Sequence, residues 1–310
     1  MQKKYIFGPV ASRRFGMSLG IDLVPHKTCT IDCVYCECGA TTNLTTIRAE
    51  YYPTSDIINE IDNVLANYSG TPIDYITLTG SGEPTLHSHI AEIIDHLKTH
   101  YPQFKTASLT NGTLLCDPQV RKDISHIDLA KISIDCVTAD SFTRINRPAA
   151  ALDLKTMLDG IVTFCEEYTG KVWIEVFIIE GINDSENEIN ILKNLLTKIK
   201  PDIIHLNSLD RIGVEDWVRP ASEATLQRIA NALSPLPTVI VKRAAATAQQ
   251  PEQPANITDA QLCQDITALL RRRPSTIQDM MTSFGCSEER IKEVLKKIKA
   301  VSDNKMYHLK

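Results

Sequence analysis

Four cysteines lie within ten residues near the N-terminus, and their spacing is the strongest chemical signal in the sequence. Cys29, Cys33 and Cys36 form the pattern C-x3-C-x2-C, and Cys38 follows closely. Three thiolates in one short loop can each bind one iron of a cubane cluster. The fourth iron of such a cluster has no protein ligand and is open to a small molecule. The spacing therefore predicts a [4Fe-4S] cluster with one open iron.

A four-thiolate zinc site with Cys38 as its fourth ligand is the alternative interpretation. Structural zinc sites usually take their ligands from two separated pairs, whereas a single residue separates Cys36 from Cys38. The chain holds nine cysteines, an odd number, so they cannot all pair as disulfides. The remaining five are widely spaced, as is typical of small buried hydrophobic residues: Cys116, Cys136, Cys165, Cys263 and Cys286.

The composition is that of a globular protein. The chain has 310 residues, of which 43% are apolar and 23% charged, with a net charge of −5. These values exclude a collagen, a disulfide-rich miniprotein and a wholly disordered chain, and the negative charge argues against a general affinity for nucleic acid. No apolar run reaches about 18 residues, so no membrane span is predicted. The expected compartment is the cytoplasm, where thiols stay reduced.

Short apolar runs alternate with amphipathic segments between residues 18 and 243, which predicts an α/β fold with parallel strands. Several runs are almost wholly apolar, as in strands that are covered on both faces. Apolar residues at helical spacing predict helices over 54–68 and 89–99, and a serine cap marks the start of another over 185–199. The predicted strands are Ser18–Asp22, Tyr75–Thr79, Thr106–Thr110, Leu129–Ile134, Val172–Ile178, Ile203–Asn207 and Thr238–Lys242.

Glycine and polar residues follow the second, third and fourth predicted strands, at the ends where α/β barrels bind ligands. Gly82 lies in a Gly-Ser-Gly-Glu-Pro segment and allows close backbone approach to a ligand, and Glu83 beside it offers a carboxylate. Asn111 ends the third strand, and Ser133 and Asp135 end the fourth. The alternatives are a plain turn for the Asn-Gly pair and a helix cap for the aspartate.

Residues 244–254 contain two prolines and no large apolar side chain, which predicts a linker. The segment after it, 255–310, carries ten Lys and Arg against seven Asp and Glu. Arg271, Arg272 and Arg273 suit contacts to RNA phosphates or, alternatively, a solvated helix end. Three helices and a terminal hairpin predict a small winged helix-turn-helix domain, with helices over 258–272, 275–284 and 287–300 and a strand over 305–309.

The cysteine pattern, with Tyr35 directly before its last cysteine, resembles the cluster motif of the radical S-adenosylmethionine (SAM) superfamily. Thr79–His87 resembles the glycine-glutamate-proline motif of that superfamily. The resemblance implies a partial (βα)6 TIM-like barrel over residues 1–243, with the cluster loop after its first strand. It implies that SAM chelates the open iron, and that an electron splits its sulfonium to give a 5′-deoxyadenosyl radical, which abstracts hydrogen from a substrate. An external donor such as flavodoxin or ferredoxin would supply the electron.

The same resemblance assigns SAM contacts to particular residues, namely Tyr35, Gly82, Glu83, Asn111, Ser133 and Asp135. A hypothesis from another class is an iron–sulfur electron carrier or redox sensor coupled to the winged helix. Ferredoxin-like carriers use four cysteines for each cubane and do not need a Gly-Glu-Pro loop.

A narrower resemblance is to a prokaryotic branch whose members are labelled as relatives of the wyosine tRNA synthetase. It rests on Phe7–Arg14, Leu19–Leu23, Ile145–Pro148 and Asp216–Pro220. Wyosine-base synthases carry a second set of cysteines before the first, and the first 28 residues here contain none. The expected substrate is an RNA or tRNA base, or a peptide, recruited by the C-terminal domain. Several side chains in or near these segments suit either a bound phosphate or carboxylate or structural ion pairs: Arg13, Arg14, Arg147, Asn207 and Arg211.

Overall fold

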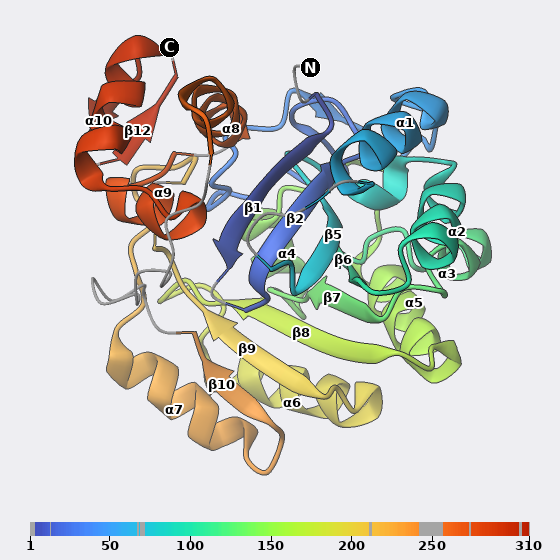
Figure 1. The fold of residues 1–310 in the computed structure, drawn as a ribbon. Helices are drawn as coiled ribbons and strands as arrows, with labels where there is room; N and C mark the ends of the chain where they lie inside the picture. The colour runs from blue at the N-terminus through green and yellow to red at the C-terminus, as the bar shows by residue number, and fades with distance from the viewer. Residues whose placement is uncertain are drawn as a thin grey trace.

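The computed structural model of the protein has a curved central sheet, with a C-terminal group of helices beside one of its edges (Figure 1). It describes residues 4–12, 14–66, 68, 72–210, 213–241, 257–272, 274–303 and 306–309. The predicted linker, 244–254, lies outside the described residues, as do Arg13, Arg211 and Arg273.

Eight strands form the central sheet, in the order β1-β2-β5-β6-β7-β8-β9-β10. β1 (Ile6–Ser12) is an edge strand that pairs antiparallel with β2 (Gly16–Asp22), and every later pair in the sheet is parallel. The remaining strands are β5 (Tyr75–Thr79), β6 (Lys105–Thr110), β7 (Leu129–Ser133), β8 (Lys171–Phe177), β9 (Ile203–Asn207) and β10 (Thr238–Ile240). β3 (Thr28–Cys29) and β4 (Asn43–Leu44) form a separate small pair.

The parallel α/β fold and all seven predicted strands are confirmed, but the sequence analysis missed β1. Gly8 and Pro9 in the middle of β1 are turn residues by type, and the strand's register shifts between Phe7 and Val10. An edge strand tolerates proline because one side of it needs no partner for the missing amide.

Seven helices follow the strands and cover the outer face of the sheet (Figure 1). Ile57, Ile61 and Leu65 show the pattern, since they share one face of the first helix and all lie in the core. The helices are α1 (Thr54–Leu65), α2 (Ile90–His100), α3 (Pro118–Asp123), α4 (Ala139–Ile145), α5 (Leu154–Glu167), α6 (Glu186–Ile199) and α7 (Glu223–Leu233), with a short 3-10 helix over Pro84–Leu86.

The inner face of the sheet is polar, which corrects the expectation of strands that are apolar on both faces. Side chains alternate along each strand, so Ile132 and Ile174 pack in the core while Lys131 and Glu175 point the other way and meet each other. Three aromatic rings meet beside this polar group near the amino ends of the strands, where Phe15 stacks on Trp173 and meets Tyr75 edge-on. The inner face is therefore polar, and we call the three rings of Phe15, Tyr75 and Trp173 its aromatic floor.

The C-terminal unit, residues 257–309, has a hydrophobic core of its own that also includes Val10 of β1. It packs directly on the edge of the sheet, where the amide of Ala11 donates to Ser283 Oγ. Arg272 forms an ion pair with Asp22 at 2.5 Å, and both side chains are nearly buried. Its elements are α8 (Asp259–Arg272), α9 (Ile277–Phe284), α10 (Glu288–Lys297), β11 (Val301–Asp303) and β12 (Met306–His308).

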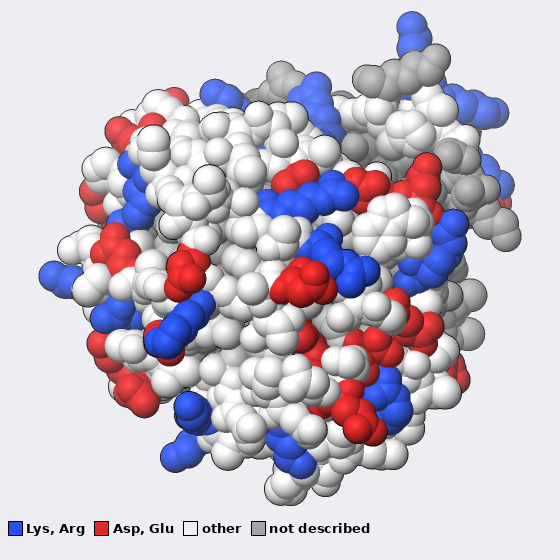
Figure 2. Space-filling model, turned by 180° about the vertical axis from the view of Figure 1, so that it is seen from behind, with Lys and Arg blue, Asp and Glu red and all other residues white. Residues whose placement is uncertain are grey.

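The surface carries mixed charge. Figure 2, which shows the molecule from behind, has positive and negative side chains interspersed over that face. No helix in the described part of the chain combines the length and apolar composition needed to cross a bilayer.

Candidate active site

The cysteine loop lies at the carboxyl end of β2, between that strand and the turn after α4. Cys29 and Cys33 are buried together with Ile31, and Cys36 packs against them. Backbone hydrogen bonds hold the loop, because the amide of Val34 donates to the Ile145 carbonyl and that of Cys36 to the Cys33 carbonyl. All the cysteines in the described chain are free thiols.

Three side chains from separate segments donate to the three predicted cluster ligands. Lys27 Nζ lies 3.0 Å from Cys36 Sγ. Asn146 Nδ2 lies 3.2 Å from Cys33 Sγ, and Asn111 Nδ2 lies 3.6 Å from Cys29 Sγ. Donors of this kind stabilise a thiolate and tune the potential of an iron–sulfur cluster. Within the loop, the three sulfurs that receive nitrogen donors are the three that the spacing predicts as iron ligands.

Cys36 is the thiol most easily ionised in the loop. A hydrogen bond with Cys38 and the charge of Lys27 together lower the pKa of Cys36 to about 6, against the effect of burial. Burial raises the pKa of Cys29 to about 11 and that of Cys33 well above its usual value. Bound iron would hold all three as thiolates, since a coordinating thiol is deprotonated.

The residues of the loop fit the ligand set of a cubane cluster. A cubane needs only three thiolates around a larger body, and the loop presents three buried or half-buried thiols.

The glycine-rich loop after β5 packs against the strand that leads to Cys29. A Cβ at Gly82 would overlap the carbonyl oxygen of Thr28, and one at Gly80 would overlap the Asp22 carboxylate. The amide of Glu83 donates to the same Thr28 carbonyl. The glycine at position 82 is therefore required by close contact with the cluster loop, while its predicted contact with SAM stays a prediction.

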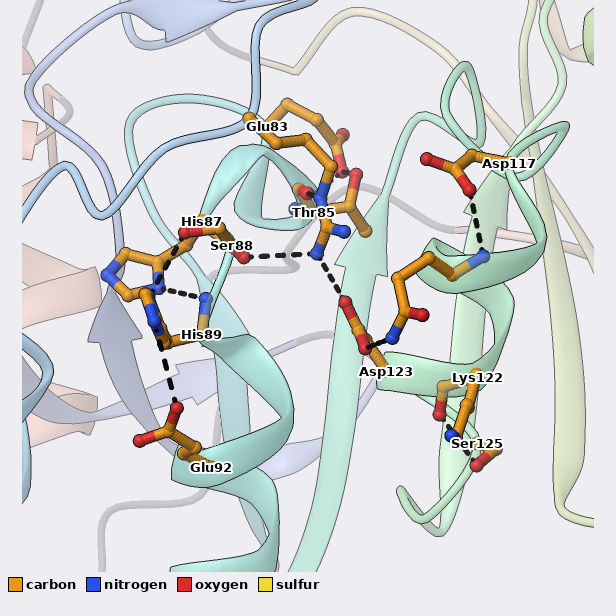
Figure 3. Close-up of polar contacts among 12 residues, drawn as sticks. Glu83, Thr85, His87, Ser88, His89, Glu92, Asp117, Lys122, Asp123 and Ser125 are labelled. Atoms are coloured by element: carbon orange, nitrogen blue, oxygen red, sulfur yellow. Dashed lines mark hydrogen bonds and ion pairs between the residues drawn. The ribbon is translucent and has the colours of Figure 1, made fainter.

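The Glu83 carboxylate faces into the protein. It is 2% exposed and accepts hydrogen bonds from the Thr85 amide and hydroxyl, from the Thr110 hydroxyl at 2.6 Å and from the Asn111 amide at 2.8 Å. Figure 3 shows Glu83 and Thr85 turned toward each other. Burial raises the pKa of Glu83, and these four donors oppose the rise. The carboxylate therefore fixes the backbone of Asn111, whose side-chain Nδ2 lies near the sulfur of Cys29.

The predicted residues Tyr35 and Asp135 meet each other directly. The Tyr35 hydroxyl donates to Asp135 Oδ2 at 2.5 Å, and Asn146 Nδ2 donates to the same oxygen at 2.9 Å. The other oxygen accepts from the Phe177 amide, and the Tyr35 ring stacks on the Phe177 ring with centroids 3.8 Å apart. Asp135 thus holds Tyr35 and Asn146 beside Cys33. Its predicted contact with SAM is untested.

Ser133 lies on the inner face at the end of β7, in register with Glu175 of the next strand.

Sequence reasoning missed Lys27 and Asn146. Lys27 lies two residues before the first cysteine, and it is 3% exposed with a positive φ of 56°. A lysine so close to a metal-binding loop was the available signal, whereas the position of Asn146 beside Cys33 comes only from the fold.

A large cavity connects the cluster loop with the inner face and the C-terminal unit. Its volume is about 1140 Å³, and Cys36, Tyr35 and Phe177 line it at the cluster end. Gln278 and Tyr307 of the C-terminal unit line it on the opposite side. One ligand-sized space therefore meets both the predicted cluster and the C-terminal unit.

The family model of the radical SAM superfamily matches residues 23–190, from just before the cysteine loop into α6. The chain belongs to the radical SAM superfamily. Its cofactors are accordingly a [4Fe-4S] cluster and SAM. The narrower likeness to the wyosine-related branch stays a prediction.

Curated relatives cover between 66% and 98% of this radical SAM protein. A UPF0026 protein of Methanocaldococcus jannaschii is 30% identical over 98% of this chain and 95% of its own. A protein named GTPase Obg from Brachyspira hyodysenteriae is 33% identical over 96% of this chain, but the match spans only 43% of that protein. A UPF0026 protein of Helicobacter pylori is 38% identical over 66% of each chain. The chain thus spans less than half of one of these relatives and about two thirds of another.

Solved structures share the fold of this radical SAM protein. A radical SAM methyltransferase from Sphaerobacter thermophilus superposes with a TM-score of 0.55 at 17% identity, over 72% of this chain and 65% of that one. A structure of anSMEcpe with bound AdoMet and a peptide gives a TM-score of 0.50 at 15% identity, over 70% of this chain and 58% of that one. At these identities the likeness establishes the fold alone.

Changing Glu83 to glutamine should weaken SAM binding about tenfold while leaving the iron content unchanged. The NH2 of the glutamine side chain would face Thr85, Thr110 or Asn111, all of which donate hydrogen bonds to the native carboxylate. A buried donor left unsatisfied in this way costs about 1–3 kcal/mol. Equilibrium dialysis of SAM with the cluster-loaded protein measures the affinity. Glu92→Gln on the exposed side of α2 is the matched control. Unchanged SAM affinity in Glu83→Gln would show that the carboxylate does not position the site.

Proposed function

We propose that the protein binds SAM at the open iron of its cluster and uses the resulting radical on a substrate held in the cavity. Cys29, Cys33 and Cys36 would hold the cluster, which would supply the electron that splits bound SAM into methionine and a hydrogen-abstracting 5′-deoxyadenosyl radical. The observation that carries the proposal is the set of three donors to three cysteine sulfurs, at one end of a ligand-sized cavity.

The chain's own residues set the environment of this chemistry. Lys27, Asn146 and Asn111 orient and stabilise the three thiolates. The stacked rings of Tyr35 and Phe177 form an aromatic wall of the cavity that Cys36 also lines. Cys38 is not an iron ligand in this proposal, and its role is the hydrogen bond with Cys36.

The SAM contacts in this proposal come from the carboxyl ends of three neighbouring strands. Gly82 places the loop backbone near the cluster, and Asn111 and Ser133 offer polar side chains at the ends of β6 and β7. Glu83 and Asp135 act through their neighbours, Glu83 by holding Asn111 and Asp135 by holding Tyr35.

The test is formation of 5′-deoxyadenosine. Anaerobic, cluster-loaded protein reduced with dithionite should slowly convert SAM to 5′-deoxyadenosine and methionine without added substrate, as measured by chromatography with mass detection. The Cys33→Ala variant should give none. If the intact, reduced protein gives none, even with cell extract, the electron carrier or redox sensor becomes the better hypothesis.

The C-terminal unit is, in this proposal, a winged helix-turn-helix built from α8, α9, α10 and the β11–β12 hairpin, and the barrel is a partial (βα)6 type over residues 1–243. The unit would recruit substrate, and an external flavodoxin or ferredoxin in the cytoplasm would supply the electron.

The expectation that Arg272 contacts RNA phosphate is wrong, because this side chain is paired with Asp22 against the barrel. Arg271 beside it is exposed, so the support for an RNA substrate is reduced to one described arginine of the three.

A further inference from the structure

A cluster of three charged side chains lies on the inner face, and two of them, Arg14 and Glu175, line the same cavity as Cys36. Glu175 of β8 pairs through one oxygen with Lys131 of β7 at 2.5 Å and through the other with Arg14. Arg14 and Lys131 lower the pKa of Glu175 to about 2, although burial raises it, so the carboxylate is ionised. Burial lowers the pKa of the neighbouring His205 to about 4, so this imidazole is uncharged at neutral pH. One carboxylate therefore faces two cationic side chains.

Arg14 has hydrogen-bonding capacity that the protein leaves unused. Its Nε is buried and has no hydrogen-bond partner among the described residues. An unsatisfied buried donor of this kind costs about 1–3 kcal/mol. Asp135, a second carboxylate that attracts Lys131, does not serve as the partner of Arg14. Its oxygens accept hydrogen bonds from Tyr35, Asn146 and the Phe177 amide. The Arg14 side chain is nonetheless 18% exposed and lines the cavity, so the open part of its guanidinium can bind an anionic oxygen of a ligand.

The cavity reaches Arg14, and its polar walls suit a polar ligand. Arg14 and Glu175 line it together with Ser18, Thr77 and Asn207. The C-terminal unit also lines the cavity, and the buried pair of Arg272 and Asp22 fastens it to the barrel. A volume of about 1140 Å³ between these walls holds SAM and a small molecule, but not a folded RNA or protein.

We propose that the cavity binds a small substrate through a carboxylate or phosphate group, with Arg14 as the anion-binding residue. Glu175 holds the guanidinium in place through one oxygen, and Lys131 binds its other oxygen. The substrate extends from Arg14 toward Cys36, where the radical would form. Arginine suits this task because its planar group binds both anions through paired hydrogen bonds. The inference rests on the proposed function, since it identifies the substrate class of the same site.

The binding site has a built-in reporter. Trp173 stacks on Phe15 at the aromatic floor beside Arg14, and the chain has only one other tryptophan, Trp217. In a Trp217→Phe background, the full-length protein is titrated with inorganic phosphate and, separately, with acetate. The fluorescence of Trp173 should change saturably, and the anion with the lower midpoint identifies the preferred group.

Arg14→Gln should weaken this binding at least tenfold, and Arg14→Lys should weaken it less because the positive charge is retained. Arg228→Gln, which removes a surface ion pair with Asp184, is the matched control and should bind as the parent does. Thermal unfolding and iron content establish that each variant folds. If Arg14→Gln does not fold, Arg14→Lys takes its place in the comparison. No saturable change with either anion, or equal binding in the folded Arg14 variant, would overturn the inference. The titration needs no electron and no SAM, so its failure is separate from a failure to form 5′-deoxyadenosine.

Discussion

Replacing Cys33 with alanine should leave the anaerobically purified protein almost without iron, whereas the parent carries about four irons and four sulfides per chain. Cys33 is buried and has its own donor in Asn146, and the three-thiolate cluster loses one of its iron ligands without it. Cys29→Ala and Cys36→Ala should have the same effect. Iron and sulfide analysis, with the absorbance of the brown cluster, measures the result.

Cys38→Ala is the matched control, because it removes a thiol from the same loop and should leave the iron intact. The loss of its hydrogen bond to Cys36 should change the cluster's potential, since contacts to the sulfurs tune that quantity. Stoichiometric zinc in place of iron, or loss of metal in Cys38→Ala as well, would contradict the three-cysteine cluster.

Replacing Arg272 with methionine should release the C-terminal unit from the barrel. The substitution leaves the Asp22 carboxylate buried without its partner, and breaking such a pair costs about 3–5 kcal/mol. Hydrogen exchange of the β1 amides near the unit, including that of Ala11, should accelerate by at least about a hundredfold, because each 1.4 kcal/mol is a factor of about ten.

Arg271→Met changes the exposed neighbour in the same helix and should leave this exchange unchanged. The double variant Asp22→Asn/Arg272→Met should recover part of the protection, since it removes both charges together. Equal protection of β1 in Arg272→Met and in the parent would show that the pair does not hold the unit in place.

The sequence was sufficient for the parallel strands and for the cluster loop, because both depend on local patterns. Runs such as Ile203–Asn207 are apolar enough to be recognised in isolation, and the cysteine ligands lie within one loop. β1 was missed because Gly8 and Pro9 are turn residues by type, and only the pairing with β2 makes them part of a strand.

Other errors arose where a charged side chain finds its partner far along the chain. Arg272 looked like a surface cation, yet Asp22 lies 250 positions earlier and is buried against it. Likewise, the Lys131–Glu175 pair lies on strands that the sequence analysis predicts to be buried on both faces. Such contacts depend on how the strands curve and on where the C-terminal unit packs, and no local pattern of residues encodes either.

The most direct measurement of the central claim is electron–nuclear double resonance of the reduced, cluster-loaded protein with SAM labelled at its amino nitrogen and carboxylate oxygen. Binding of SAM to the iron that lacks a cysteine ligand predicts hyperfine coupling from both labels to the cluster spin. The coupling should persist in Cys38→Ala. A cluster signal that is present but unaffected by labelled SAM would contradict the account, because it would show that the cluster has no open iron for SAM.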